Sequence, residues 1–238
     1  MTSTVHHVPE HHHADVSGGW LRAAVFGAMD GLVSNIGLIA GVGGANVPPR
    51  AVLITGAAGL VAGAISMALG EYTSVKTQVE QVTAELEKER REIERNPDGE
   101  IEELAKMWIA RGFPEDLARQ AAKVVHTNPE EALRVHAQEE LGVVPGEQPS
   151  PWTAAFSSFA CFAVGALIPL LPYLFGATVL WPAIVAGGLG LFLVGAIAAR
   201  FTARPWWVSG LRQLLLGAAA AGITYLIGMG IGAGASAL

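Results

Sequence analysis

The sequence predicts an all-α integral membrane protein with five transmembrane helices and an acidic helical domain inserted between helices 2 and 3. Of its 238 residues, 51% are hydrophobic and only 15% are charged. With a mean hydropathy of +0.41, this composition is typical of membrane proteins rather than soluble domains. Residues 76–148 hold 17 acidic and 10 basic side chains, so the acidity is confined to one segment. A segment of this charge attracts cations and repels nucleic acid.

The chain starts with a histidine-rich tail, residues 1–19, and a first span is expected from Trp20 to Asn46. About 20 apolar helical residues cross a hydrocarbon core of about 30 Å. This span contains Asp30, and an ionisable residue inside a span is a functional candidate by default. The alternative is that Asp30 lies near enough to the interface to snorkel to it or to pair with Arg22, two turns before it. Metal capture and a non-binding tail are both open for the histidines of the tail: His6, His7, His11, His12 and His13.

A second span is expected from about Ala51 to Tyr72, after a break at two prolines. No turn follows it, so Thr73–Arg95 is predicted to continue the same helix into water. Met67 and Glu71 are four residues apart and therefore lie on one helix face. Each alone has an ordinary interpretation, as a packing residue and an interfacial charge. A thioether beside carboxylates, in contrast, favours a borderline ion such as Fe²⁺ over Mg²⁺ or Ca²⁺.

The acidic segment, residues 78–148, is predicted to form a small helical domain between spans at 20–77 and 149–238. A turn at Asn96–Gly99 ends the long helix. Three shorter helices follow, at Glu100–Arg111, from Pro114 to about Asn128, and at Pro129–Leu141. Carboxylates and one imidazole recur at helical spacing along these helices: Glu85, Glu89, Glu92, Glu100, Glu103, His136 and Glu140. They form either a solvated face with ion pairs or a metal site, because clustered carboxylates repel unless a cation joins them.

Three further spans are expected at about Trp152–Phe175, Ala177–Ala199 and Trp206–Leu238. Two prolines, Pro169 and Pro172, predict a kink or an early end in the first of these. The last span carries glycines at four-residue spacing in two registers, which is typical of close helix packing: Gly228 with Gly232, and Gly230 with Gly234.

The placement of Lys and Arg predicts the orientation of the spans. With the N-terminus inside, 14 of the 15 basic residues lie on the cytoplasmic side and only Arg50 lies outside. The N-terminus and the acidic domain are therefore expected in the cytoplasm. No catalytic motif accompanies this arrangement, since there is no phosphate-binding loop and no paired Glu-x-x-His, so neither an enzyme nor a cofactor is expected.

Together these residues resemble the vacuolar iron transporter family, in a bacterial-type form. The resemblance rests on Asp-Gly-Leu-Val-Ser-Asn at 30–35, on the stretch 63–72 around Met67, and on Glu-Glu-Leu-Gly at 139–142. It implies a homodimer of five-helix protomers with the ion path between protomers, and exchange of Fe²⁺, and often Mn²⁺, for protons. It also implies the inner membrane of a bacterial cell, or a vacuolar membrane if the source is eukaryotic.

The resemblance also assigns residues. Asp30 and Met67 match the family's ion path, and Glu71 is a further candidate. The glutamates of the family's metal-binding domain are matched by Glu89, Glu92, Glu100, Glu103 and Glu140. Two positions depart from eukaryotic members: Gly59 replaces a carboxylate, and His136 with Ala137 replaces two methionines. An imidazole makes the site harder, so Zn²⁺ joins Fe²⁺ and Mn²⁺ among the candidate ions.

Two functional hypotheses follow. In the first, cytoplasmic glutamates gather Fe²⁺ or Mn²⁺ and pass it to Met67 and Asp30, and the ion leaves the cytoplasm in exchange for protons. In the second, the protein is a membrane-tethered metal-binding protein that buffers or senses iron without moving it. The polar residues of the spans are then structural.

Overall fold

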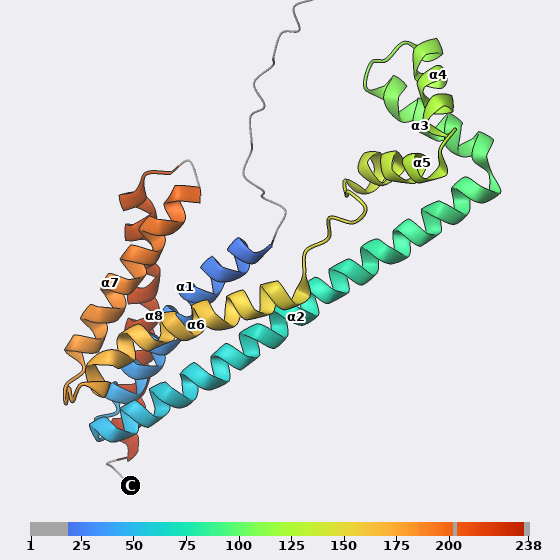
Figure 1. Cartoon of the computed structure of the whole chain (residues 1–238). Coiled ribbons are helices and arrows are strands. Elements are labelled where there is room, and N and C mark those ends of the chain that lie inside the picture. Colours follow the sequence, from blue (N-terminus) through green and yellow to red (C-terminus); the bar gives the residue numbers. More distant parts are fainter. Residues whose placement is uncertain (1–18, 202–203, 236–238) are drawn as a thin grey trace, which may run out of the picture.

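The computed structural model describes residues 19–201 and 204–235, and every element in these ranges is a helix. The histidines of the tail lie outside the described residues. Figure 1 shows the helices in chain order: α1 (Trp20–Gly44), α2 (Pro49–Arg95), α3 (Pro97–Ala110), α4 (Glu115–Val125), α5 (Pro129–His136), the π-helix η1 (Ala137–Leu141), α6 (Pro151–Leu174), α7 (Trp181–Ala198), the short η2 (Ala199–Phe201) and α8 (Trp206–Ala235).

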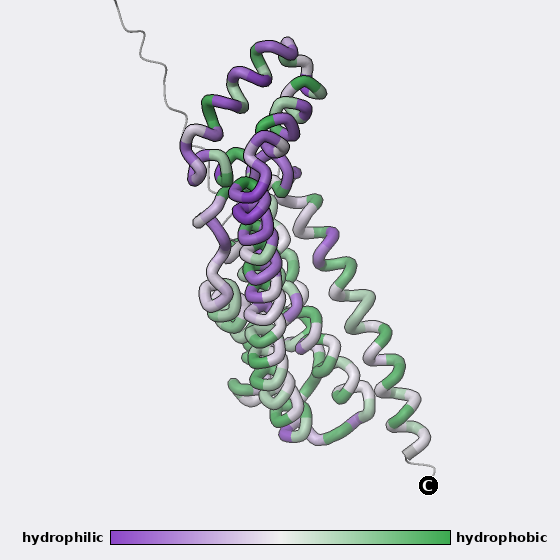
Figure 2. Tube along the Cα trace, turned by 90° about the vertical axis from the view of Figure 1, so that its right-hand side faces the viewer, coloured by the Kyte–Doolittle hydropathy of each residue, from purple (hydrophilic) through white to green (hydrophobic). Residues whose placement is uncertain are grey.

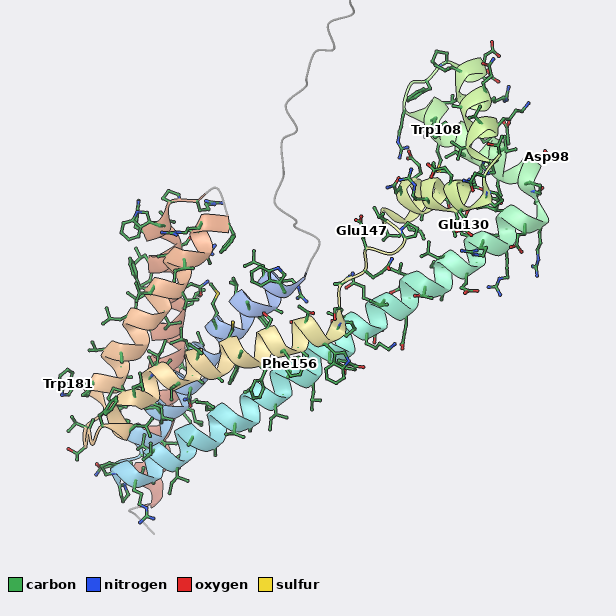
Figure 3. All side chains as sticks on the ribbon, in the orientation of Figure 1. Asp98, Trp108, Glu130, Glu147, Phe156 and Trp181 are labelled. Carbon is green, nitrogen blue, oxygen red and sulfur yellow. The ribbon has the colours of Figure 1, made fainter. Side chains whose placement is uncertain are left out.

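Five of the described helices are long and apolar enough to cross a membrane: α1, α2, α6, α7 with η2, and α8. Figure 2 shows that hydrophobic residues dominate this bundle, whereas the far part of α2 and the helices beyond it are mostly hydrophilic. The prediction of an all-α protein with five apolar spans is confirmed. Trp181, at the start of α7, is 67% exposed and projects outward from the bundle, as Figure 3 shows. A tryptophan in this position suits the membrane interface.

Helix α2 is a single helix of 47 residues, as the lack of a turn after Tyr72 predicts. At 1.5 Å per residue it is about 70 Å long, more than twice the thickness of a hydrocarbon core. Its first part packs against α6 and α1, and its last part carries α3, α4 and α5 away from the bundle (Figure 1). One continuous element therefore joins the apolar bundle to the acidic helices.

Some expected helix boundaries are wrong. The predicted turn at Asn96–Gly99 shrinks to Asn96 alone, because α3 already begins at Pro97. Asn96 accepts a hydrogen bond from the Gly99 amide at 3.2 Å, and proline is well suited to the first helical position. Helix α6 does not end early but runs through both of its prolines to Leu174. Helix α7 begins at Trp181 instead of Ala177.

The two glycine registers of α8 have different roles. A Cβ atom at Gly228 would overlap the carbonyl oxygen of Gly41, and one at Gly232 would lie 2.8 Å from the Cα of Ala45. Gly230 and Gly234 have no heavy atom within 4 Å of such a Cβ. Only the first register therefore brings the backbones of α8 and α1 together.

A substitution of Gly228 by leucine is expected to lower the thermal stability of the detergent-solubilised protein, since the side chain overlaps backbone that cannot move aside. We expect a destabilisation of about 2 kcal/mol or more. Gly230→Leu is the matched control, on the same helix and half a turn away. Its free energy of unfolding should lie within about 0.5 kcal/mol of that of the original protein. Equal melting of the two variants would contradict the assigned packing.

Candidate metal centre

A cavity of about 500 Å³ lies where the end of α2 meets α3 and η1. Its lining is mostly acidic and consists of Glu85, Lys88, Glu89, Glu92, Arg95, Asn96, Glu100, Glu103, Glu140 and Leu141. Figure 3 locates the region: Asp98 lies in the first turn of α3 and Glu130 in the first turn of α5, both near the far end of α2. The structure thus gathers six glutamates of the acidic segment around one space.

Three of the lining and neighbouring side chains converge closely. Glu89 of α2, Glu100 of α3 and His136 of α5 each offer one ligand atom, and these atoms lie within 4.8 Å of one another. All three residues are buried, with His136 at 0% exposure. Each comes from a different helix, so the tertiary fold and not the sequence spacing assembles them.

The imidazole of His136 is at the centre of the cluster. Its Nδ1 atom lies 2.7 Å from Glu140 Oε1, 2.9 Å from Glu89 Oε1 and 3.9 Å from Glu100 Oε2. Nδ1 carries at most one hydrogen, which is directed to Glu140. Glu89 Oε1 is buried and has no hydrogen-bond partner among the described residues. A buried carboxylate oxygen without a donor is costly, and a cation in the cluster would remove that cost.

A π-helix brings Glu140 to this position. Helix α5 ends at His136 and continues as η1, which Gly142 closes with a left-handed φ of 65°. The sequence instead predicts one helix through Leu141. Short π-helical segments are frequent at functional sites. Trp108 holds η1 in place by donating its Nε1–H to Glu139 at 3.1 Å, and Arg111 pairs with the same carboxylate.

Burial and mutual repulsion alter the acidity of the cluster. Burial, followed by the nearby carboxylate of Glu140, raises the pKa of Glu89 to about 7. Burial and then Glu103 raise the pKa of Glu100. These carboxyl groups retain protons at a pH where an exposed glutamate has lost them. A cation that binds these carboxylates at such a pH has to displace protons from them.

Metal affinity is expected to fall as the pH drops below about 7, because an incoming cation must then displace the proton on Glu89. Below that pKa, one displaced proton lowers the affinity about tenfold per pH unit. Without metal, the raised pKa of Glu89 means that its protonated form stabilises the folded protein. This contribution is fully present below about pH 4.5 and is lost as the pH rises to about 7. Calorimetric titration with Mn²⁺ between pH 5.5 and 8 measures the first effect, and thermal melting of the metal-free protein measures the second.

Glu89→Gln is the matched variant for this titration, since it removes the titrating group and keeps the shape. Its pH slope is expected to be shallower between pH 5.5 and 7. An unchanged slope would assign the bound proton to another group.

The other predicted ligands lie farther out. Glu85, Glu92 and Glu103 line the cavity and are exposed, so they form its outer acidic wall. The side chain of Glu140 is 26% exposed, between the wall and the buried cluster. The solvated-face interpretation holds elsewhere in the segment, where Arg119 pairs with Glu102 and Glu115.

Asp30 and Met67, the residues predicted for the ion path, contact different residues within the protomer. Asp30 accepts a hydrogen bond from Ser34 Oγ at 2.9 Å, one turn further along α1. Met67 packs against Ala64 of its own helix and against Phe162 and Ala166 of α6. Both side chains are half-buried.

One of the alternatives for Asp30, a pair with Arg22, is wrong. Arg22 instead donates to Glu71 Oε2 at 2.9 Å, which joins the start of α1 to α2. The side chain of Glu71 is 8% exposed and that of Arg22 is 65% exposed. The pair therefore neutralises a buried carboxylate where the two helices reach the interface, and Glu71 has a structural partner that the spacing from Met67 does not reveal.

Sequence reasoning missed one residue next to the cluster. The ring of His126, at the end of α4, contacts the ring of His136 edge-on, with centroids 5.2 Å apart. Burial lowers the pKa of His126. The two histidines are ten positions apart on different helices, so periodicity could not connect them.

The fold and this cluster together define a multi-pass membrane protein that carries a buried cluster of two carboxylates and one imidazole beyond the end of one of its spans. A sequence profile of the VIT family matches residues 21–229, and the chain belongs to this family. The "Vacuolar iron transporter" of Acanthamoeba castellanii is 41% identical over 221 residues, which cover 89% of this chain and 78% of that protein.

Plant relatives are similar to this chain over a comparable length. "Vacuolar iron transporter 1" of Oryza sativa subsp. japonica is 32% identical over 226 residues, covering 92% of this chain and 88% of the relative. "Vacuolar iron transporter 1" of Arabidopsis thaliana is 30% identical over 228 residues, covering 93% and 89%. The predicted family is confirmed, and the similarity extends through the spans and the acidic helices alike.

Proposed function

We propose that this chain transports Fe²⁺, and also Mn²⁺, out of the cytoplasm in exchange for protons. Its membership of a family whose relatives are named vacuolar iron transporters supports the ion and the reaction class. The observation that carries the proposal is the buried convergence of Glu89, Glu100 and His136. Two carboxylates and one imidazole suit Fe²⁺, Mn²⁺ and Zn²⁺ better than they suit Mg²⁺ or Ca²⁺.

The acidic helices face the cytoplasm in this proposal. The start of α1, the end of α7 with η2, the start of α8, and α3 to α5 lie toward the same end of the bundle in Figure 1. Basic residues at that end include Arg22, Arg200 and Arg204, and the opposite end has Arg50 in the first turn of α2. An excess of Lys and Arg marks the cytoplasmic side.

The ion path lies between two protomers in this proposal. The spans in α2 and α8 are each only 17% buried within one protomer, compared with 44% for α1 and α6. A homodimer that packs through such a face places the half-buried Asp30 and Met67 near a partner. Asp30 then alternates between metal and protons, because an ionisable group in a span can hold either. Glu71 remains a path candidate in this proposal, although its pair with Arg22 favours a structural role.

Proteoliposomes containing the purified protein and an internal Fe²⁺-sensitive dye test the proposal. An imposed pH gradient is expected to drive Fe²⁺ uptake and simultaneous proton movement, which a pH dye on the opposite side records. An Fe²⁺ uptake rate that is the same with and without the pH gradient would contradict proton exchange. Mn²⁺ and Zn²⁺ in place of Fe²⁺ determine the ion preference.

A membrane-tethered metal-binding protein is the second candidate. It is favoured by the partners of the span residues, since Ser34 binds Asp30 and α6 packs against Met67. This function gives metal binding to the intact protein but no flux. The same proteoliposomes, loaded and empty, therefore separate the two candidates.

A further inference from the structure

Three exposed arginines lie at or near the connection between α7 and α8, and none has an acidic partner among the described residues: Arg200, Arg204 and Arg212. Residues 149–238 contain no Asp or Glu. Arg22, toward the same end of the bundle, is by contrast paired with Glu71 at 2.9 Å. Within the described part of the chain, the positive charge at this corner is therefore not neutralised.

Close packing of α7 and α8 fixes the level of the first two arginines. A Cβ atom on Gly195 of α7 would lie 2.6 Å from the carbonyl oxygen of Ser209 in α8, so the two backbones meet there. Arg200 lies five residues beyond Gly195 in the direction of the connection, and Arg204 lies two residues before Trp206. Both arginines are therefore at the end of the helix pair, near the first turn of α8.

Arg212 lies deeper, in the apolar part of α8. Trp206 and Trp207 at the start of this helix are exposed, as is typical of side chains at a membrane interface. Arg212 is five residues beyond Trp207, which is about 8 Å along the helix axis. Its neighbours Leu211 and Leu215 are exposed as well, so no other helix of the protomer covers this face. A charged group at such a depth is costly unless it finds a partner.

The direction of α8 allows Arg212 to reach the interface. The Cα–Cβ bond of a helical residue tilts toward the start of its helix, and the start of α8 carries Trp206 and Trp207. A long arginine side chain can extend in that direction while its methylene groups stay in apolar surroundings. Lipid phosphates lie in the polar headgroup region that flanks the hydrocarbon core. The guanidinium of Arg212 can therefore join those of Arg200 and Arg204 at the level of the headgroups.

We propose that Arg200, Arg204 and Arg212 bind the headgroup of an anionic phospholipid in the leaflet at this end of the bundle. A guanidinium donates paired hydrogen bonds to phosphate oxygens. A headgroup that also carries a quaternary ammonium, as in phosphatidylcholine, would bring another positive charge to the corner. The site thus prefers a lipid of net negative charge, such as phosphatidylglycerol. None of the three arginines belongs to the metal cluster or to the proposed ion path, so this lipid site is independent of transport.

The same charges disfavour a second copy of the chain as the occupant of this face. Two copies that met through this part of α8 would bring their arginines together, and residues 149–238 offer no carboxylate to place between them. Like charges repel one another. An anionic lipid neutralises the corner instead.

Native mass spectrometry of the full-length protein tests the proposal, after incubation in micelles with equal amounts of phosphatidylglycerol and phosphatidylcholine. The two lipids have the same acyl chains, so only their headgroups differ. The original protein is expected to retain mostly phosphatidylglycerol. One arginine near the headgroups corresponds to about fivefold in binding, so Arg212→Gln and Arg204→Gln should each lower the ratio of the two bound lipids by about that factor. Equal retention of both lipids by the original protein would overturn the proposal.

Arg50→Gln is the matched control, because Arg50 is also exposed but lies in the first turn of α2, at the opposite end of the bundle. It removes the same charge and should leave the lipid ratio unchanged. An equal loss in Arg50→Gln and Arg212→Gln would mean that overall charge sets the preference, and the site would be rejected. Thermal melting identifies variants that do not fold. If Arg212→Gln is one of them, an unchanged ratio in Arg204→Gln would overturn the proposal.

Two further measurements identify the occupant. Glycerophosphoglycerol, which is the headgroup without acyl chains, and inorganic phosphate should not displace the bound lipid even in large excess. Displacement by either would indicate a site for soluble phosphates and contradict a lipid site. The same spectra report the fraction of dimers. A dimer fraction that changes in Arg212→Gln, with an unchanged lipid ratio, would assign this face to contact between copies and overturn the proposal.

Discussion

Replacement of Asp30 by asparagine is expected to reduce gradient-driven Fe²⁺ uptake by about 100-fold. The amide keeps the size of the side chain but removes its negative charge and its ability to release a proton. A lost charge–ion interaction of about 3 kcal/mol corresponds to this factor. Initial uptake rates in proteoliposomes, at matched protein density, measure the effect.

Met67→Ala should also slow uptake of Fe²⁺, and more than that of Mn²⁺, because the thioether is a soft ligand.

Ser34→Ala is the matched control, since it removes the hydrogen bond to Asp30 but keeps the carboxylate. Its uptake is expected to stay within about tenfold of the original rate, because an exposed hydrogen bond typically contributes a net of only about 0.5–1.5 kcal/mol. Full-rate transport by Asp30→Asn would exclude this carboxylate from the path. Flux that is absent even in the original protein, together with metal binding, would support the tethered alternative.

The second large effect is expected at the buried cluster. Glu100→Gln and His136→Asn each remove one of three converging ligands while keeping similar shape, and each should weaken Mn²⁺ binding by about tenfold to a hundredfold. The double variant should abolish measurable binding at the cluster. Calorimetric titration of the solubilised protein at pH 7.5, where proton competition is weak, gives these affinities.

Glu94→Gln provides the comparison for charge alone. Glu94 is exposed on α2 between Ile93 and Arg95 and does not line the cavity. Its removal changes the net charge as Glu100→Gln does, so the Mn²⁺ affinity should change less than about threefold. Equal losses in the two variants would mean that general negative charge, and not the cluster, holds the metal.

Much of the fold follows from the sequence, because long apolar runs and the absence of a turn are local properties. The continuity of α2 through Tyr72 is such a case, and so is the break before Pro49. Helix ends were harder. The pattern Asn-Pro-Asp-Gly predicts a turn at Pro97, although an Asn cap with proline at the first position also starts a helix. Only the tertiary packing of α1 separates Gly228 from Gly230.

The candidate site was predictable in part. Helical spacing correctly grouped Glu85, Glu89 and Glu92 along the cavity wall, because they share one helix. Spacing also correctly paired His136 with Glu140, four residues apart, whose Nδ1 and Oε1 atoms lie 2.7 Å from each other. Spacing could not show that His136 would be fully buried, nor that Glu140 would lie on a π-helix. The partner of Glu71 was equally hidden, since Arg22 lies on another helix 49 residues away.

The length of α2 limits how tightly the cluster can hold its ion. Along the helix axis, Glu89 lies roughly 22 residues and about 33 Å beyond Met67, several Debye lengths at physiological salt. In the proposed transport cycle, an ion would therefore dissociate from the cluster, rehydrate and diffuse toward Met67 within a protomer. If every transported ion visits the cluster and turnover is about 10 s⁻¹, release must be at least that fast. With capture near 10⁸–10⁹ M⁻¹s⁻¹, roughly the diffusion limit, the dissociation constant of the cluster cannot lie far below about 10⁻⁸ M.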